Sequence, residues 1–563
     1  MSRSTKRSDA IPILLLVSLC IVLTAHRILN VTSSVGMLNT DSEGTTWWIW
    51  SRCVGQSQLS EASQVAFPNG FDLSRLPVFN LVDELRIQFA QLFDCSISSI
   101  IFQLAVFPTI CLVSNSLAGY ALGRTLFHNR ESAFLLGLTC AFSSQIILAT
   151  RTPLANNVIF PGLLAVVFAT KWLVRRTTKS LLLLVLFQSL QTLINVYNGF
   201  ALLILILAIL FAHPLRLDEP FLTRLRGSAV AVAASVVGLM PLILSQMYLF
   251  TQPKLKEIYR PVEMSGEILP MSALVTKDRG IYRLLSPSTW PHPEAGWLST
   301  PLMLALVVLL IFFWLRKDKP RELVIFIRRL LLVSTVLVLL IWDVPPFQFL
   351  RTFYFEVFFA LRGVSNFGKI IPILISIVCL ILLQPYLRIN NDRVERSPRT
   401  KIFIGIFTVL FLIDNVPISA SYWHLQDIRP LIQSYGSPDV RRSSGPIAQF
   451  PDFMYGPKWG LPQRFIQLAQ IGDNRPRLNG RDFQQLTDGS AAMPLPTDDA
   501  SLGQLVKRGA TTVMLHRALI PVADLEKSLN YLRSRKFEEH GFTFAEHTSS
   551  IYQTLDVIIF ELR

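Results

Sequence analysis

Long apolar stretches recur along this chain, separated by short polar connections. A helix that crosses a bilayer needs about 20 predominantly apolar residues, and most of the stretches approach this length. They cover residues 11–30, 98–122, 132–149, 157–174, 180–194, 199–213, 228–249, 299–315, 324–342, 370–387 and 402–417. The pattern predicts an all-α, polytopic membrane domain over residues 1–417, with about eleven transmembrane helices.

One short polar segment, from Asn195 to Gly199, interrupts an otherwise continuous apolar run. Asn and Gly favour tight turns, so we expect two helices joined by a hairpin at the outer surface of the membrane. Tyr197 lies in this hairpin, where it is a candidate for contact with a substrate. The alternative is an aromatic anchor at the membrane interface.

Basic residues fall in every second connection between the apolar stretches. They are Arg3, Lys6 and Arg7 before the first stretch, Arg124 and Arg130 after the second, Arg175, Arg176 and Lys179 after the fourth, Arg216, Arg224 and Arg226 after the sixth, Arg316, Lys317, Lys319 and Arg321 after the eighth, and Arg388, Arg393, Arg396, Arg399 and Lys401 after the tenth. Loops rich in Lys and Arg stay in the cytoplasm. This predicts a cytoplasmic N-terminus, an extracytoplasmic C-terminus and outer loops at residues 31–97, 250–298 and 343–369.

The composition agrees with a membrane location. The chain of 563 residues is 51% hydrophobic and 16% charged, whereas soluble domains contain about 25% charged residues. Lys and Arg outnumber Asp and Glu by 53 to 38, but because this excess lies in loops it reports orientation, and no nucleic-acid partner is expected. The apolar segment 11–25 resembles a signal peptide without a cleavage site, so we expect a retained anchor.

The tail, residues 418–563, differs in kind from the rest of the chain because it is polar and punctuated by Pro and Gly. Strand-like runs lie at residues 445–450, 511–516 and 557–562, and residues 524–535 have helical spacing of leucines. These patterns predict a C-terminal extracytoplasmic α/β domain. It contains no metal motif, phosphate loop or nucleophile elbow, which favours a lid or docking domain.

The cysteines divide into two groups. Four lie within apolar runs, where a packed thiol is expected: Cys20, Cys111, Cys140 and Cys379. Cys53 and Cys95 both lie in the first outer loop, so they form a disulfide if the compartment is oxidising, or remain as two unmatched thiols.

Four short motifs follow one another in the outer loops. They are Asp41-Ser-Glu-Gly-Thr-Thr-Trp-Trp-Ile-Trp50, Ala66-Phe-Pro-Asn-Gly70, Leu284-Leu-Ser-Pro-Ser-Thr-Trp-Pro-His-Pro293 and Leu361-Arg-Gly-Val-Ser-Asn-Phe-Gly368. In these motifs and their order the chain resembles the GT-C superfamily of polytopic membrane glycosyltransferases, and in particular its bacterial members with a C-terminal extracytoplasmic domain. The sequence departs from the family pattern at Asn366, where the family usually carries a second arginine.

The resemblance implies an enzyme that takes a sugar from a polyprenyl-phosphate donor at the outer face of the plasma (cell inner) membrane. An acceptor hydroxyl attacks the anomeric carbon in an inverting transfer, and a carboxylate takes the acceptor proton. Asp41 is the first candidate for this base and Glu43 the second. The alternative is that both acids are solvated loop residues or that they begin a helix. The acceptor would be a glycan, lipid or protein of the cell envelope.

The donor phosphate calls for cationic partners on the same side. The candidates are Arg279, Arg283, Arg351, Arg362 and Lys369. For each of them, a side chain that reaches to lipid headgroups is the alternative.

Further loop residues are candidates for acceptor binding or for shaping the loops. Asp278 and His292 lie in the middle outer loop, and Asn69 lies in a Pro-Asn-Gly turn of the first. Some members of the superfamily use a divalent cation such as Mg²⁺ or Mn²⁺, and the sequence leaves this open because it contains no dedicated metal spacing.

Two other classes of function remain open from the sequence. One is a lipid or small-molecule transporter, for which polar residues inside the spans are typical; this chain has Ser114, Asn115, Gln188 and Gln191 in such places. The other is a non-catalytic envelope assembly factor that keeps the same fold.

Overall fold

A computed structural model gives the structure of this chain. It describes residues 3–29, 49–50, 53, 81–149, 157–212, 221–240, 299–316, 320–341, 349, 364–387, 398–416, 445–450, 478, 493–517, 520–543 and 556–562. The chain divides into two compact units. The helical unit comprises Met1–Leu29, Val78–Val82 and Ala105–His424, and the second unit comprises Asn30–Pro77, Asp83–Leu104 and Leu425–Arg563. The domain boundary between residues 417 and 418 stays a prediction.

Every apolar stretch named above contains at least part of a helix. The helices are α1 (Arg3–Leu29), α4 (Ile97–Phe127), α5 (Arg130–Phe142), α6 (Ser144–Ala149), α7 (Phe160–Arg175), α8 (Thr178–Ile194), α9 (Val196–Ala212), α10 (Phe221–Gly238), α13 (Thr300–Leu315), α14 (Arg321–Ile341), α16 (Ile371–Leu387) and α17 (Pro398–Asn415). A short 3₁₀ helix, η6 (Val364–Lys369), precedes α16. Within the described residues, Val106–Phe127 and Leu323–Leu340 are long and apolar enough to cross a membrane. The number of crossings stays a prediction.

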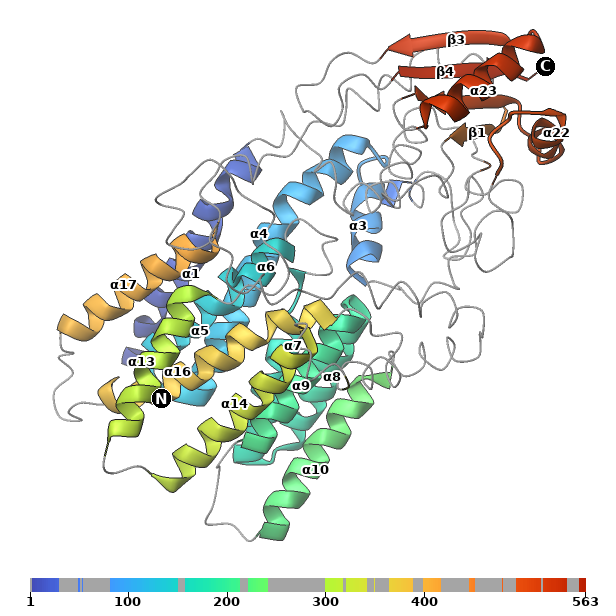
Figure 1. Ribbon diagram of the computed structural model, residues 1–563. Coiled ribbons are helices and arrows are strands. Elements are labelled where there is room, and N and C mark those ends of the chain that lie inside the picture. Colours follow the sequence, from blue (N-terminus) through green and yellow to red (C-terminus); the bar gives the residue numbers. More distant parts are fainter. Residues whose placement is uncertain are drawn as a thin grey trace. The chain divides into compact units, whose positions relative to one another are not determined.

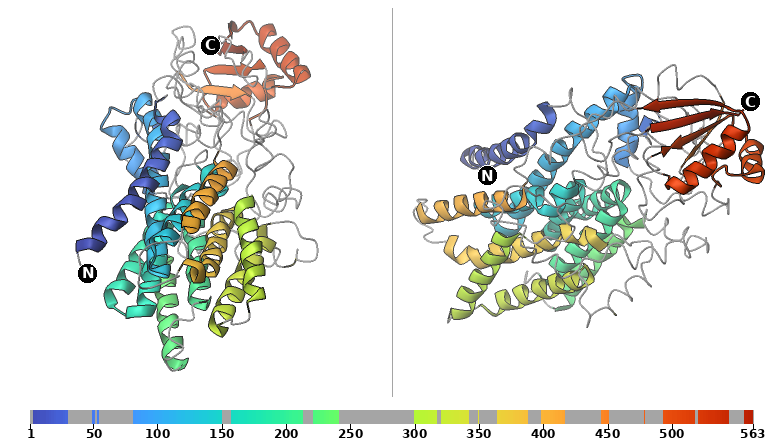
Figure 2. Two further views of the ribbon diagram at one scale, coloured as in Figure 1. Left: turned by 90° about the vertical axis from the view of Figure 1, so that its left-hand side faces the viewer. Right: turned by 45° about the horizontal axis from the view of Figure 1, so that its top comes forward.

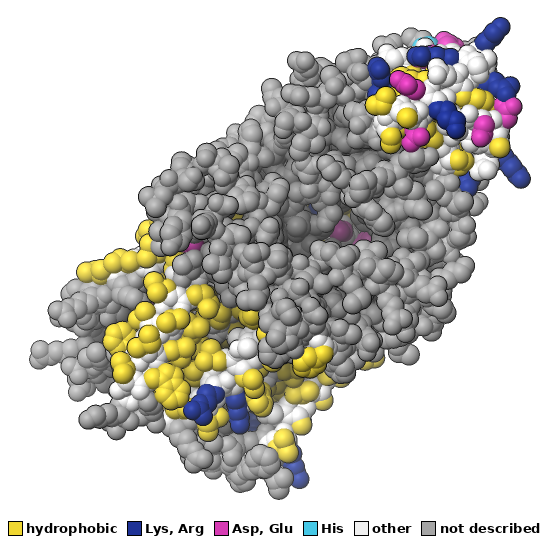
Figure 3. Space-filling model, in the orientation of Figure 1, with side chains coloured by type: hydrophobic (Ala, Val, Ile, Leu, Met, Phe, Trp, Pro, Cys, Tyr) yellow, Lys and Arg dark blue, Asp and Glu magenta, His cyan; other side chains and the backbone are white. Residues whose placement is uncertain are grey.

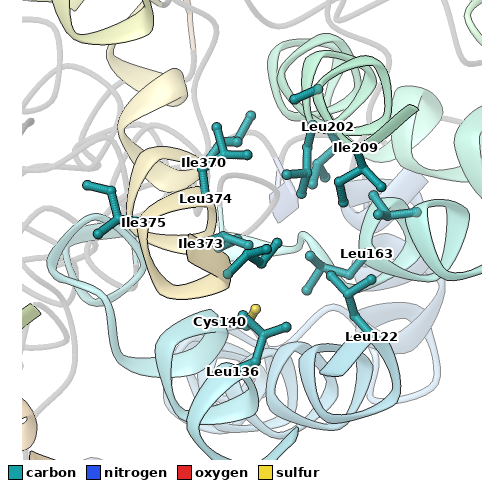
Figure 4. Close-up of a cluster of buried hydrophobic side chains, with 14 of the residues drawn as sticks. Leu122, Leu136, Cys140, Leu163, Leu202, Ile209, Ile370, Ile373, Leu374 and Ile375 are labelled. Carbon is teal, nitrogen blue, oxygen red and sulfur yellow. The ribbon is translucent and has the colours of Figure 1, made fainter. Parts of the chain in front are cut away.

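The helices of the helical unit surround one apolar core. Helices α7, α8, α9 and α10 lie side by side, and α16 lies against α5, α13 and α14 (Figures 1 and 2). Figure 4 shows side chains from several helices pointing toward one another in this core. Those labelled are Leu122, Leu136, Cys140, Leu163, Leu202, Ile209, Ile370, Ile373, Leu374 and Ile375.

Two glycines let α4 approach α5 closely. Gly119 and Gly123 lie four residues apart, and therefore on one face of α4. A Cβ at Gly119 would lie 2.7 Å from Cβ of Cys140, and one at Gly123 would lie 2.5 Å from Cα of Ala133. Small residues with this spacing are typical of helix pairs in membranes, because their backbones can approach each other.

The expected hairpin between α8 and α9 is tighter than the sequence predicted. α8 ends at Ile194 and α9 begins at Val196, so Asn195 is the single residue between them. Its Oδ1 accepts a hydrogen bond of 2.9 Å from the backbone N–H of Asn198, which caps the start of α9. Asn198 and Gly199 therefore lie in the first turn of a helix and not in a loop.

The second unit contains a four-stranded sheet in the order β1-β2-β4-β3. β1 (Ile447–Phe450) pairs in parallel with β2 (Thr512–His516), and β4 (Asp556–Glu561) pairs antiparallel with both β2 and β3 (Glu538–Thr543). Leucines of α22 (Asp499–Lys507) and α23 (Val522–Ser534) join alternate residues of the strands in its core. β1, β2, β4 and α23 confirm the predicted elements to within two residues.

We predict that Gly123→Ala destabilises the helical unit, because the new methyl group meets backbone of α5. The expected loss in the free energy of unfolding is about 1–3 kcal/mol. Gly405→Ala in α17 is the matched control, since a Cβ there meets nothing within 4 Å. It should be neutral or slightly stabilising. Denaturant unfolding of the purified protein in detergent measures both, and equal losses would contradict the close packing of α4 on α5.

Candidate functional site

Buried amides surround the short non-helical segment that leads into α7. Asn115 on α4 donates from Nδ2 to the carbonyl of Asn157 at 2.8 Å, and its Oδ1 accepts from the N–H of Ile159 at 3.1 Å. All three side chains are buried. The single side chain of Asn115 therefore satisfies two backbone groups that precede α7.

Gln191 on α8 supports the same segment from another direction. Its Nε2 donates to the carbonyl of Val158 at 2.9 Å, and its Oε1 accepts from the N–H of Gly162 at 3.1 Å. The N–H groups in the first turn of a helix have no partner within the helix, so Gln191 satisfies one of those at the start of α7.

Asn198, in the first turn of α9, links the backbone before α7 to Lys369 at the end of η6. Nδ2 of Asn198 donates to the carbonyl of Val158 at 3.2 Å, and Nζ of Lys369 donates to Oδ1 of Asn198 at 2.8 Å. Asn198 is 1% exposed and Lys369 is 5% exposed. The side chains around these two residues are apolar: Ile159, Ala201, Leu202, Ile370 and Ile373. The amino group and the amide are therefore buried together in an apolar surrounding.

Other polar side chains lie buried beside Asn198 and Lys369. The side-chain amide of Asn157 and Nε2 of Gln145 form no hydrogen bond with the described residues. Gln145 packs against Gly368, because a Cβ at Gly368 would lie 3.1 Å from its Cγ. Buried polar groups are normally paired, so these atoms are available to a water molecule or to a polar group of a ligand. We define Asn157, Asn198, Gln145 and Lys369 as the polar layer.

Lys369, a candidate partner of the donor phosphate, is buried in the protein. Phe367 and Ile370 on either side of it are almost fully buried, and Phe367 packs near Phe200 with ring centroids 6.1 Å apart. Because these neighbours are buried, Lys369 between them is buried too, and Oδ1 of Asn198 accepts a hydrogen bond from its amino group. Its role toward a donor phosphate stays a prediction.

Tyr197 lies half-buried in the first turn of α9 and packs against the core of the helical unit. Its contact with a substrate stays a prediction. The other predicted site residues lie outside the described part of the chain. They are Asp41, Glu43, Asn69, Asp278, Arg279, Arg283, His292, Arg351 and Arg362. The described residues include no group of three His, Cys, Asp or Glu side chains that could hold a metal ion, and the divalent cation stays a prediction.

The described part of the first outer loop is held by a disulfide and a buried arginine. Cys53 and Cys95 form the disulfide, which decides between the two alternatives that the sequence left open. Arg86, on α3 (Leu81–Gln91), is fully buried; Nε donates to Oε1 of Gln103 on α4 at 3.2 Å, and Nη1 lies 3.2 Å from Oδ1 of Asp83. Sequence reasoning missed this network, although the spacing of Asp83 and Arg86 suits a helical ion pair.

Comparison with known proteins identifies the fold. No family model and no curated protein match the chain. The oligosaccharyltransferase of Archaeoglobus fulgidus in the apo form matches with a TM-score of 0.54 and 13% identity, over 99% of this chain and 76% of that one. The chain has the GT-C fold. This confirms, for the fold, the resemblance noted in the sequence.

Two further solved structures were also found. The same oligosaccharyltransferase, tethered to an acceptor peptide with the NVT sequon, has a TM-score of 0.53 and 11% identity, over 96% of this chain and 73% of that one. ArnT from Cupriavidus metallidurans, bound to undecaprenyl phosphate, has a TM-score of 0.40 and 11% identity, over 97% of each chain.

We predict that Asn198 and Lys369 are energetically coupled. The variants Asn198→Ala and Lys369→Met each remove one partner of the hydrogen bond, and the double variant removes both. Because a buried polar group that loses its partner costs about 1–3 kcal/mol, the double variant should lose less stability than the sum of the single ones. Denaturant unfolding of the four proteins gives the coupling energy. Losses that add to within about 0.5 kcal/mol would show that the bond contributes nothing.

The disulfide leads to a second prediction. The denatured protein should take up four thiol labels before reduction, at the four free cysteines, and two more after reduction, at Cys53 and Cys95. Mass spectrometry counts the labels. In Cys53→Ser, Cys95 loses its partner, so all remaining cysteines should react without reduction. Full labelling of the unreduced wild-type protein would contradict the disulfide.

Proposed function

We propose that this protein is a membrane glycosyltransferase. It takes a sugar from a polyprenyl-phosphate donor at the outer face of the plasma membrane and transfers it, with inversion, to a glycan, lipid or protein of the cell envelope. The observation that carries the proposal is the GT-C fold, which extends over 99% of the chain. The matched protein is an oligosaccharyltransferase, and the four outer-loop motifs resemble the same superfamily.

In the proposed reaction a carboxylate at the membrane surface takes the proton of the acceptor hydroxyl. Asp41 fits this role because it follows α1 closely in sequence, and the donor phosphate lies at the same surface. Glu43 is the second candidate. General base catalysis of this kind contributes about 10²–10⁴-fold to the rate.

The leaving polyprenyl phosphate needs positive charge and hydrogen-bond donors nearby. We assign this role to Lys369 together with four outer-loop arginines, which are Arg279, Arg283, Arg351 and Arg362. One observation supports Lys369, because its amino group bonds to Asn198 within the polar layer and is otherwise surrounded by apolar side chains. In such surroundings an interaction with phosphate is screened less than in water.

The remaining loop residues would bind the acceptor or shape the loops around it. Asp278, His292, Asn69 and Tyr197 are the candidates, and Asp278 could also hold a divalent cation such as Mg²⁺ or Mn²⁺ beside the donor.

The buried amides favour an enzyme over a transporter. Asn115 and Gln191 both bond to backbone groups before and at the start of α7, and Gln188 donates from Nε2 to the carbonyl of Gly199 at 2.8 Å. Polar residues in an apolar stretch suggest a transport pathway, but here each of these three has a structural partner. The presence of these three residues is therefore explained without a transport pathway.

Sugar transfer by the purified protein tests the proposal. A panel of polyprenyl-phosphate sugars is offered as donors, and sugar release or transfer is followed by mass spectrometry. Wild-type protein should turn over at least one donor, and Asp41→Asn should lose about a hundredfold or more. Glu43→Gln is the matched control, because it removes a neighbouring charge but not the assigned base. All variants should unfold at the wild-type temperature.

The outcomes separate the alternatives. If Glu43→Gln loses activity and Asp41→Asn does not, the protein is an enzyme whose base is Glu43. If both variants lose a small and equal part of the activity, neither acid is the catalytic base. A wild-type protein inactive on every donor would contradict the proposal and favour an assembly factor.

A further inference from the structure

Two adjacent arginines lie within a long apolar helix of the chain. Arg328 and Arg329 belong to α14, inside the 18-residue segment Leu323–Leu340 that is apolar enough to cross a membrane. Both side chains are exposed. Ionisable residues in such segments are rare, because removing a charge from water is costly.

Arg329 binds the end of a neighbouring helix. Its Nη1 donates to the carbonyl of Phe211 at 2.8 Å, and its guanidinium lies 4.8 Å from the centroid of the Phe211 ring. α9 ends at Ala212, so Arg329 supplies a positive charge where the helix dipole is negative. This contact accounts for Arg329 by a structural role.

Arg328 has a different environment. Its guanidinium lies 5.6 Å from the ring centroid of Trp314, near the end of α13. Among the described residues, no carboxylate forms an ion pair with Arg328 or Arg329. Stacking on an indole holds the guanidinium plane but leaves its N–H groups directed to the sides.

The surface around Arg328 is apolar. Trp314 is 51% exposed, and neighbouring positions on α13 and α14 also expose large apolar side chains: Phe312, Leu315, Ile325 and Leu332. Figure 3 shows basic side chains set within the hydrophobic surface of the helices. Such a surface suits contact with lipid chains.

The position along the helix gives the depth in the membrane. Arg328 lies seven residues after the start of α14, which corresponds to about 10 Å along the axis. An arginine at this depth can extend its head to the level of lipid headgroups. Arg316, which caps the end of α13 and is exposed, lies at the same end of the helix pair. The charge pattern predicts that this end is cytoplasmic.

We propose that Arg328 and Trp314 form a binding site for the phosphate headgroup of an anionic phospholipid, with Arg329 and Arg316 adding positive charge. The guanidinium N–H groups bind the phosphate oxygens, the indole fixes the guanidinium plane, and the exposed apolar side chains contact the acyl chains. The site lies on the side of the membrane opposite the proposed sugar transfer, and the inference does not depend on that function.

The test compares lipid binding by purified full-length variants. Native mass spectrometry of the protein in neutral detergent measures bound phosphatidylglycerol against phosphatidylcholine. Wild-type protein should prefer phosphatidylglycerol, and Arg328→Gln should weaken its binding about tenfold, as expected for the loss of a hydrogen bond to a charged group. Arg328 is the residue to change, because Arg329 also holds the end of α9.

Lys179→Gln is the matched control, since it removes one exposed positive charge from the start of α8, at the end of the bundle that the charge pattern also predicts to be cytoplasmic. It should leave phosphatidylglycerol binding unchanged, and Arg328→Lys should lie between wild type and Arg328→Gln. Inorganic phosphate should not displace the lipid. The proposal is overturned if both lipids bind equally well, or if Lys179→Gln weakens phosphatidylglycerol binding as much as Arg328→Gln does. It is also overturned if inorganic phosphate fully displaces phosphatidylglycerol. Thermal unfolding in phosphatidylcholine checks that each variant is folded.

Discussion

Helices in apolar surroundings must satisfy every backbone N–H and C=O group from within the protein, because no water is there to bond to them. This constraint is most severe where a helix begins or breaks. In this chain, Asn115 and Gln191 bond to the backbone before and at the start of α7, and Asn195 caps α9. Amide side chains both donate and accept, so one residue satisfies groups of both kinds.

The same solution brings polar chemistry into the interior of the helical unit. Once Asn198 lies in the first turn of α9, its amide oxygen can accept a hydrogen bond from Lys369 at the end of η6. An amino group can then stay buried beside apolar side chains without being left unbonded. Polar atoms of Asn157 and Gln145 remain available nearby. A structural requirement of the backbone thus provides the setting for the proposed phosphate contact.

Local patterns predicted most of the helices and strands, because the spacing of apolar residues and the position of turn residues indicate them directly. The helices and the strands β1, β2 and β4 were found in this way. β3 was missed because its sequence, Glu538–Thr543, is largely polar and becomes a strand only by pairing with β4. The burial of Lys369 was not predicted, because it depends on Asn198, which is 171 residues away in sequence. Arg86 was missed for the same reason, since Gln103 lies on another helix. Spatial partners of this kind leave no mark in a single sequence.

The disulfide between Cys53 and Cys95 also affects how this protein can vary in evolution. It closes the intervening segment into a ring whose ends are fixed, with 5.6 Å between the two Cα atoms. Inserting or deleting residues within the ring changes the entropy of closure only slowly, because that cost grows with the logarithm of length. The ring is therefore a place where the loop can gain or lose residues at little entropic cost.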